Sequence, residues 1–596
     1  MRRYIEDLAL ISDLHTGALV AKDGSIDWLC LPRFDSDAAF CALLGDEANG
    51  RWLLSPTVPI ENVARRYRGD SLILETTIHT KEGSVELIDF MPPRKEGPTV
   101  VRIVRWLAGK VPMQTRIACR FAYGTMPPWV HRSGDHIAFT IGPDAIALRS
   151  NVHLDIEPPD VTGSFEVNEG QDFYFLFQSH ESSRRGPRGY EPAELLERTE
   201  TYWSEWSAKC AYQGPYRKQV LRSLIALKGL IYAPSGGSIA ALTTSLPEDL
   251  GASSNWDYRF SWIRDSAFTV EALVAGGYHD EARAWRDWLL RVLAGEPQKL
   301  QIMYSVQGNR RLEEYEADWL SGYEGSTPVR IGNQASEQFQ LGIYGHLMSA
   351  IFSAHDKAKI RIDEQAWAML GRLIEHICDV WRRPDSGIWE YRGKPYHYTL
   401  SRVMAWLTMQ IAVCAIEEKG YDGPLDRWRG VRDEIAAEVC ERGFNPRRNA
   451  FVEYYGSNDL DAGLLHMPIV GFLPIDDERW QGTLEAIERE LCVDGFVMRD
   501  SRHVSPGVGG VLNPTEGAFL ACNMWLVENY ALAGRLHDAK TLFERVAGIA
   551  NDVGLLAEEY DVRFRRQVGN FPQTFSHSTL VNAAVRIAEA ESRMHR

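Results

Sequence analysis

The pattern of hydrophobic and polar positions changes near residue 185. Before it, short runs rich in β-branched residues alternate with turn signals, as in 71–81 (SLILETTIHTK) and 84–90 (SVELIDF), which flank Glu82-Gly83. Such a pair predicts a β-hairpin. Further strand-like runs lie at 100–107, 114–123, 136–141, 145–148 and 173–178. Many short strands with turns between them favour an antiparallel β-sandwich.

A helical periodicity follows the polar stretch 182–187 (SSRRGP), which is a plausible domain boundary. Residues 192–208 are expected to form a helix in a linker, and beyond residue 215 the apolar positions recur mostly at helical spacing. The expected helices lie at 216–232, 263–275, 280–293, 337–354, 363–381, 398–418, 425–441, 478–491, 516–533, 536–549 and 576–590.

Long loops rich in Gly, Trp, Asp and Arg connect these helices, and the sequence shows no convincing repeat. This combination favours a closed barrel of helical hairpins over a solenoid, with the loops at one end forming a site. We therefore expect a multidomain chain. It should have an antiparallel β-sandwich over residues 1–185, a helical linker over 186–214 and an all-α domain over 215–596.

Charge and targeting signals narrow the possible partners. The net charge is −16, and no stripe of Lys and Arg is present, which argues against a nucleic-acid partner. Glu6, Asp7 and Asp13 interrupt what would be the apolar part of a secretion signal. No apolar run is expected to be long enough to span a bilayer. We expect no secretion and no membrane partner.

The nine cysteines are scattered singly, with no CxxC pair that would indicate zinc or redox chemistry. We expect reduced thiols in a cytoplasmic protein, with no metal site and no cofactor. The sequence makes no prediction of the oligomeric state.

Glu390 lies between two aromatic residues in 387–393 (GIWEYRG), on an expected loop before a helix. Desolvation beside indole and phenol rings would raise its pKa, as a general acid at neutral pH requires. Arg392 would lower that pKa if it paired with Glu390, so it has to point at a substrate or at another acid. A surface ion pair of Glu390 with Arg392 is an equally good interpretation of this heptapeptide alone.

Glu516 is a second candidate, in a stretch typical of a helix start, with Thr515 as the N-cap. The helix dipole would keep a carboxylate in the first turn ionised, which suits a base that activates water. A glutamate at this position also stabilises a helix without any further role, and taken alone this simpler explanation is the more common one.

Two further loops carry groups that could bind a sugar. Arg264 and Asp265 are neighbours at an expected helix start and could donate to and accept from adjacent hydroxyls, or form a structural ion pair. The Gly-rich loop 322–340 adds Arg330, Asn333 and Gln334, whose amides suit hydroxyl recognition but also turns. Together with two glutamates placed to differ in protonation, these groups match the needs of glycoside hydrolysis.

Several blocks resemble, in order, glycoside hydrolase family 15, the glucoamylase and trehalase family of inverting glycosidases. The blocks are TTSLPEDLGASSNWDYRFSWIRDSAF (243–268), RIGNQASEQFQLGIYG (330–345), GIWEYRG (387–393), PTEGAFLAC (514–522) and GNFPQTFSHSTLVNAA (569–584). Residues 9–36 resemble the N-terminal segment of bacterial trehalase-like members. The resemblance covers nearly the whole chain and implies a β-sandwich followed by an (α/α)6 barrel.

The resemblance also implies roles for individual residues. Glu390 would be the general acid that protonates the glycosidic oxygen, and Glu516 the general base that deprotonates the attacking water. Tyr258 would help to hold that water. An inverting pair of carboxyl groups stands roughly 6.5–9.5 Å apart, which leaves room for the water between them.

The substrate-binding residues implied in the same way are Arg264 and Asp265, which would hold the outer hydroxyls of the non-reducing-end glucose, and Trp389, which would line the same subsite. Arg330 and Arg392 are included as substrate-binding candidates because they fall within matching blocks.

The expected function is that of an exo-acting, inverting α-glucosidase that releases β-glucose from a small-molecule α-glucoside. Trehalose and short α-1,4- or α-1,6-linked glucans are both possible substrates, and the trehalase-like N-terminus favours trehalose slightly. Two other classes remain open. A disaccharide phosphorylase would use phosphate in place of the base and water, and a carbohydrate-binding protein would bind sugar without turnover. The presence of both Glu390 and Glu516 counts against each of these.

Overall fold

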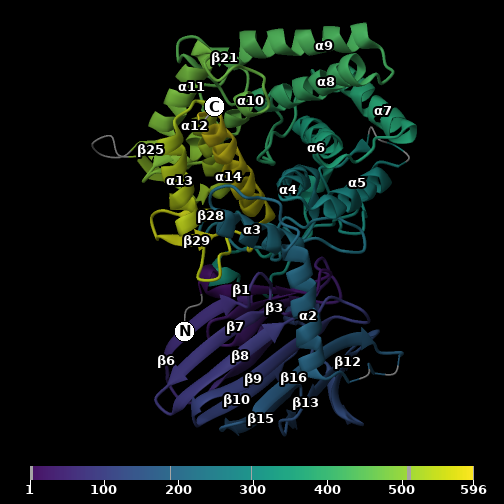
Figure 1. Ribbon diagram of the computed structural model, residues 1–596, viewed down its shortest axis with the longest axis vertical. Helices are drawn as coiled ribbons and strands as arrows, with labels where there is room; N and C mark the ends of the chain where they lie inside the picture. Colours follow the sequence, from purple (N-terminus) through teal and green to yellow (C-terminus); the bar gives the residue numbers. More distant parts are fainter. Residues whose placement is uncertain are drawn as a thin grey trace.

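Two eight-stranded antiparallel sheets form the N-terminal part of the molecule, below a ring of helices (Figure 1). The computed structural model describes residues 4–184, 186–187, 189–294, 296, 299–506 and 512–594. The sheets pack face to face: the ring of Trp52 in one sheet lies 5.4 Å from that of Phe177 in the other. Buried residues of both inner faces make one hydrophobic core, so the predicted antiparallel β-sandwich is confirmed.

The first sheet has the order β1 (Leu8–Ser12), β2 (Gly17–Ala21), β3 (Ser25–Cys30), β5 (Arg51–Pro56), β10 (Val111–Ala118), β15 (Asp160–Val167) and β14 (Asp155–Glu157), with β4 (Ala38–Phe40) paired to β3. The second has the order β11 (Trp129–Ser133), β12 (His136–Ile141), β13 (Asp144–Ser150), β16 (Asp172–Glu181), β9 (Thr99–Gly109), β8 (Gly83–Phe90), β7 (Leu74–Thr80) and β6 (Ile60–Tyr67). The predicted hairpin of 71–81 with 84–90 is the pair β7 and β8.

Helix α2 (Pro192–Ser207) connects the sandwich to the helical part. Its Leu195 and Leu196 pack in a small second core against apolar residues of the second sheet, among them Ile88 and Val101. The helix therefore covers the outer face of that sheet. The limits proposed for the three parts of the chain, at residues 185 and 214, stay a prediction.

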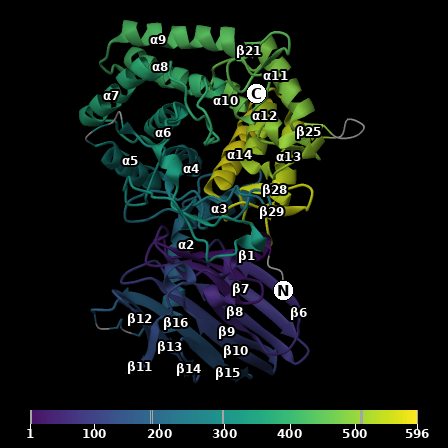
Figure 2. The ribbon, with the colours of Figure 1, turned by 180° about the vertical axis from the view of Figure 1, so that it is seen from behind.

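Six helices form an inner ring, each packed on the next, and the last packs on the first (Figures 1 and 2). They are α4 (Ile263–Ala275), α6 (Gly342–Ala358), α8 (Thr399–Lys419), α10 (His466–Ile469), α12 (Leu520–Leu532) and α14 (Thr574–Met594). The outer helices are α3 (Arg217–Gly229), α5 (His279–Leu293), α7 (Glu364–Val380), α9 (Leu425–Glu438), α11 (Glu478–Glu490) and α13 (Leu536–Gly548). This is the (α/α)6 barrel that the resemblance implied.

Inner helices are apolar around most of their circumference because they are enclosed by neighbours. Helix α8 is long and apolar enough to cross a bilayer by length and composition, contrary to the sequence-based expectation, but 72% of its apolar window is buried inside the fold. Its place in the inner ring accounts for that apolarity.

Two helices begin later than predicted: α6 begins at Gly342 rather than at residue 337, and α12 begins at Leu520 rather than at residue 516. Residues 518–519 (β27, Ala518–Phe519) pair with β28 (Glu559–Asp561), so α12 begins only at Leu520, with Phe519 as its N-cap. Glu516 therefore lies in a bend before the helix rather than in its first turn, and the helix dipole does not determine its ionisation.

The sandwich and the barrel are joined by buried hydrogen bonds. Trp28 Nε1 donates to the Leu242 carbonyl at 2.9 Å. Arg259 Nη1 donates to the Ser36 carbonyl at 2.8 Å, while its other nitrogens hold Asp257. The loop that carries Asp257 and Arg259 leads directly into α4, so this contact fixes the barrel end nearest the sandwich.

Candidate active site

A cavity of about 230 Å³ opens at the end of the barrel where the loops before the inner helices meet. Six of the eight residues proposed from the sequence line it: Tyr258, Arg264, Asp265, Trp389, Glu390 and Arg392. Arg330 and Glu516 are not among its lining residues. The wall also includes Glu248, Trp256, Trp262, Arg499, His503 and Glu558, none of which the sequence analysis had singled out for the site.

Glu390 is held from several directions. Its Oε1 accepts hydrogen bonds from Trp262 Nε1 at 2.8 Å and from Arg264 Nη1 at 3.1 Å, and its backbone carbonyl accepts from Gln338 Nε2 at 2.9 Å. Its φ of 60° is uncommon for a residue other than glycine, and such outliers concentrate at functional sites. Burial raises the pKa of Glu390, although Arg264 opposes that shift.

Arg264 and Asp265 form a pair in the first turn of α4. Arg264 Nε donates to Asp265 Oδ1 at 3.1 Å, and its Nη1 also donates to the carbonyl of Ile388 at 2.7 Å. Asp265 is only 3% exposed, and its side chain lines the cavity. Together the pair presents a donor and an acceptor side by side, as neighbouring sugar hydroxyls require.

Arg392 does not pair with Glu390. Its guanidinium binds Glu314, with Nη1 2.7 Å from Oε1, and lies 4.1 Å from the ring centroid of Trp256. The condition stated for a raised pKa of Glu390, that Arg392 point at a substrate or at another acid, is therefore met by Glu314. Arg330 lies 4.3 Å from the same indole ring and donates to the carbonyls of Ser253 and Asn255, behind the cavity wall.

Glu516 is held by Arg499 and His503. Arg499 Nε lies 3.0 Å from its Oε1 and Nη2 lies 2.6 Å from its Oε2, while His503 Nδ1 lies 2.9 Å from Oε2. Burial alone would favour the protonated form, but Arg499 and His503 outweigh it and hold the pKa of Glu516 below its ordinary value. The lowered pKa favours the ionised Glu516 that the sequence predicted, but its cause is the pair Arg499 and His503 rather than a helix dipole.

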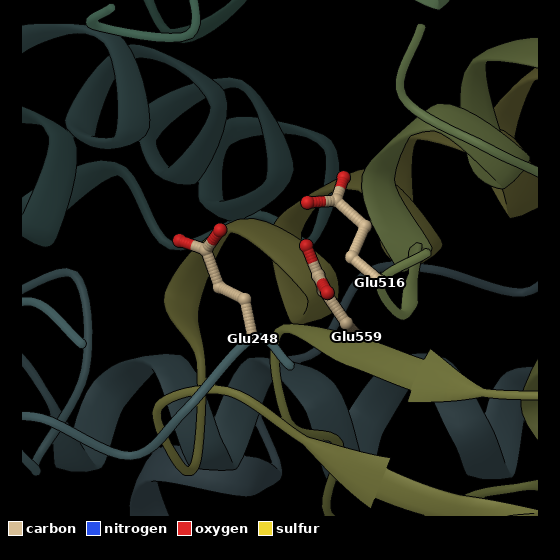
Figure 3. Close-up of side chains that lie close together, drawn as sticks. All are labelled: Glu248, Glu516 and Glu559. Carbon is tan, nitrogen blue, oxygen red and sulfur yellow. The ribbon is translucent and has the colours of Figure 1, made fainter. Parts of the chain in front are cut away.

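Three carboxylates converge behind this part of the wall (Figure 3). Oxygens of Glu248, Glu516 and Glu559 lie within 4.8 Å of one another, a spacing that could hold a cation. Arg499 already lies among them, because Nη2 bonded to Glu516 is also 3.2 Å from Glu248 Oε2. A guanidinium therefore supplies positive charge to this cluster.

Glu558 is a carboxylate of the cavity wall that the sequence analysis missed. It is 1% exposed, and the polar groups beside its carboxyl are the hydroxyl of Tyr258 and the backbone of Asn570. Burial, and after it the charge of Glu248, raise its pKa well above the ordinary value. Tyr258 adjoins it, and burial together with the charge of Glu558 raises the pKa of the phenol.

A local signal for Glu558 exists in the sequence. The run 555–561 (LLAEEYD) places two adjacent glutamates directly after three apolar residues, all three of which are buried. Gly569, with a φ of +79°, allows the approach: a Cβ there would lie 2.8 Å from Glu558 Oε2. Buried adjacent carboxylates are uncommon without pairing, and that pattern would have marked the segment.

Asp461 and His577 lie within segments near the site. Asp461 caps the 3-10 helix Ala462–Leu465 by accepting from Gly463 N, and it also accepts from Trp389 Nε1 at 2.8 Å. His577 is fully buried away from the cavity: Leu556 N donates to its Nε2, and its Nδ1 lies 3.0 Å from Ser223 Oγ.

The arrangement offers a carboxyl with a raised pKa, a second carboxyl beside a phenol, and an Arg-Asp pair within one small cavity. These are the groups that acid/base cleavage of a glycosidic bond needs, and proton transfer between carboxyl groups and a sugar requires no further group.

Comparisons with known proteins agree with this site. Residues 214–585 match glycosyl hydrolases family 15, and residues 2–164 match the trehalase-like N-terminal domain. The trehalase of Thermoplasma acidophilum is 36% identical over 580 residues, which cover 96% of this chain and 98% of that protein. The trehalase of Mycobacterium tuberculosis is 36% identical over 620 residues, which cover 98% and 90%.

Among solved structures, a bacterial glucoamylase complexed with acarbose superposes with a TM-score of 0.72. The match covers 98% of this chain and 94% of that one at 12% identity, so it supports the two-part fold. With the family match over 214–585 and relatives about one third identical along nearly their whole lengths, the chain belongs to glycosyl hydrolases family 15 and is a glycoside hydrolase.

Proposed function

We propose that the protein is an inverting, exo-acting α-glucosidase whose substrate is trehalose, with Glu390 as the general acid. The observation that carries the proposal is the setting of Glu390, a carboxyl with a raised pKa in the cavity wall beside Arg264 and Asp265. A proton donor at neutral pH needs such a raised pKa. Arg264 and Asp265 then hold the outer hydroxyls of the glucose, with Trp389 lining the same subsite.

The general base has two candidates. Glu516 was proposed from the sequence, but both of its oxygens are engaged by Arg499 and it does not line the cavity. Glu558 lines the cavity next to Tyr258, and within the described chain no arginine or lysine forms an ion pair with it. A base has to reach the attacking water within hydrogen-bond distance. The geometry favours Glu558, with Tyr258 helping to position the water.

Trehalose is the substrate that the relatives support, since the proteins about 35% identical over nearly the whole chain are named trehalases. The small cavity suits a single terminal glucose, with the second sugar near Trp256 and Arg392 at its edge. In this mechanism Glu390 protonates the departing oxygen and water attacks C1 from the opposite face. Trehalose would therefore yield one β-glucose and one α-glucose.

All nine cysteines are free thiols, and six of them are buried. Unpaired cysteines are usual in reducing compartments, which supports the proposal that the protein acts in the cytoplasm.

Proton NMR of fresh products tests the reaction, with trehalose, maltose, isomaltose and maltotriose supplied with and without phosphate. We expect equal initial amounts of α- and β-glucose from trehalose, independent of phosphate. Two α-glucose molecules from trehalose, or initial α-glucose from maltotriose, whose reducing end is released as maltose, would contradict inversion. Phosphate-dependent glucose 1-phosphate would identify a phosphorylase, and absence of turnover on all four sugars would contradict the proposed function.

A further inference from the structure

The loop that carries Glu390 is tethered on both sides, through the aromatic residues that flank the glutamate. Trp389 Nε1 donates to Asp461 Oδ1 at 2.8 Å. The hydroxyl of Tyr391 donates to Asp500 Oδ2. Asp461 is 2% exposed and Asp500 is fully buried, so neither contact is a surface interaction.

The two aspartates are also fixed relative to each other. Asp461 and Asp500 face one another in an antiparallel backbone bridge. Ala462 N donates to the Arg499 carbonyl at 2.9 Å, and Ser501 N donates to the Leu460 carbonyl at 3.0 Å. The acceptors of the two tethers therefore form one rigid unit.

Arg502 secures the Tyr391 side of this unit. Its guanidinium lies 3.7 Å from the centroid of the Tyr391 ring. Its backbone N donates to Asp500 Oδ1 at 2.8 Å, and its side chain binds both Asp500 and Glu453. Burial alone would favour protonated Asp500, but His503 and Arg502 hold its pKa below the ordinary value, so it remains an acceptor for the phenol.

The same segment also contacts the carboxylate cluster of Glu248, Glu516 and Glu559. Arg499, directly before Asp500, binds Glu516 and Glu248, and its guanidinium lies 5.7 Å from the centroid of the Trp389 ring. Residues 499–502 thus contact both the acid loop and this cluster.

We propose that Asp461 and Asp500 are positioning residues for Glu390, acting through Trp389 and Tyr391. They hold the acid loop in the left-handed conformation that Glu390 adopts, with a φ of 60°. Strained backbone of this kind persists only where surrounding contacts determine it. The proposal rests on the role of Glu390 as the general acid, and neither aspartate lines the cavity.

α-Glucosyl fluoride separates positioning of the acid from a general structural role. Hydrolysis of this substrate breaks C1–F and forms C1–O with water, whose proton passes to the base, and fluoride leaves without protonation. A defect confined to the acid should therefore reduce turnover of trehalose far more than that of α-glucosyl fluoride, because general acid assistance follows the basicity of the leaving group.

The central variant is Tyr391→Phe, which removes only the tethering hydroxyl, with Tyr396→Phe as the matched control. Tyr396 lies in the same loop with an exposed ring. Because small displacements of a catalytic group can cost on the order of 10²-fold, we expect Tyr391→Phe to lower kcat on trehalose by about 10-fold to 10²-fold. KM and turnover of α-glucosyl fluoride should change by less than about 3-fold. Tyr396→Phe should match the wild type on both substrates.

The Asp461 tether is tested by Asp461→Ala and Asp461→Asn. The amide oxygen of asparagine can still accept from Trp389, so Asp461→Asn should restore most of the trehalose turnover that Asp461→Ala loses. Asp500→Ala and Asp500→Asn test the Tyr391 tether in the same way, because the amide oxygen of asparagine can still accept from the Tyr391 hydroxyl. Thermal unfolding identifies variants that fail to fold.

The outcomes distinguish this proposal from the proposed function. If Glu390→Gln reduces turnover of trehalose and of α-glucosyl fluoride equally, Glu390 is not the acid and the proposed function fails. If Glu390→Gln shows the selective loss of trehalose turnover while Tyr391→Phe and Asp500→Ala reduce turnover of neither substrate, or of both equally, the tethers do not position the acid and the inference is overturned.

Discussion

Arg499 donates hydrogen bonds to both oxygens of Glu516, at 3.0 Å and 2.6 Å. The residue predicted to be the general base is therefore one partner of a buried ion pair. Arg499 is itself 8% exposed. Removing one partner of a buried pair typically costs about 3–5 kcal/mol because the other charge is left uncompensated. The two candidate bases can therefore be separated by comparing stability with turnover.

The first prediction concerns Glu516→Gln and Glu558→Gln. We expect Glu558→Gln to fold normally and to lose about 10²–10⁴-fold in kcat, the usual contribution of acid/base catalysis. Glu516→Gln should lower the temperature of unfolding and retain the larger share of turnover. Steady-state kinetics on trehalose and thermal unfolding provide the measurements. A large kcat loss confined to Glu516→Gln would instead support the assignment made from the sequence.

The pH profile separates the same two candidates. Activity needs an ionised base, and it falls as the pH drops through the pKa of that base. Burial and Glu248 raise the pKa of Glu558, whereas Arg499 and His503 lower that of Glu516. We therefore expect the acidic limb of kcat/KM above the ordinary glutamate value of about 4.3.

The alkaline limb depends on the acid. Because burial raises the pKa of Glu390, its proton is retained to a higher pH, and activity should fall only as the pH rises through that raised value. A profile of kcat/KM from acid to alkaline pH measures both limbs. An acidic limb well below pH 4 would favour Glu516 as the base.

Elements with local signals at both ends could be predicted from the sequence, as helix α4 (Ile263–Ala275) illustrates. It was predicted with the same bounds because its apolar periodicity begins after the aromatic loop and ends at Gly276-Gly277. The start of α12 could not be predicted in this way. Pairing of 518–519 with β28 removes that segment from the helix, and β28 lies some forty residues further along the chain.

The residues of the site could likewise be predicted only where their signal is local in the sequence. Glu390, Arg264 and Asp265 lie in segments whose chemistry is visible locally, and all three line the cavity. Glu558 reaches the cavity only because β28 and β29 (Arg566–Val568) fold back against the start of α12. Charge partners such as Glu314 for Arg392 and Arg499 for Glu516 likewise depend on contacts between distant segments.

Arg259 provides a test of how the sandwich and the barrel support each other. It is 1% exposed, binds both oxygens of Asp257 and donates to the Ser36 carbonyl in the sandwich. Arg259→Met keeps much of the side-chain volume but leaves Asp257 without its cation. We expect a loss of about 3–5 kcal/mol in the free energy of unfolding, measured by denaturant or thermal unfolding.

The matched control for Arg259→Met is Arg283→Met, which removes an arginine from an exposed ion pair with Asp280 on α5. Exposed pairs contribute at most about 1 kcal/mol, so this variant should unfold close to the wild type. Equal stability of the two variants would contradict the role assigned to Arg259.

His577 links stability to pH. Burial, and after it the charge of Arg222, lower its pKa to about 3 from an ordinary value of 6.5. A group with a depressed folded-state pKa of this kind binds protons more readily in the unfolded chain. Its contribution to stability is therefore complete above pH 6.5 and is lost as the pH falls toward 3.

The corresponding change in the free energy of unfolding is about 5 kcal/mol across that window, from about 1.4 kcal/mol per unit of pKa shift. In His577→Gln this contribution is absent, so the variant should be less stable than the wild type at pH 7. The difference should shrink as the pH falls below 6.5. His153→Gln, at a side chain that is 80% exposed, should follow the wild type. Thermal unfolding at a series of pH values measures each difference, and a gap that stays constant with pH would show that protonation of His577 does not contribute to acid unfolding.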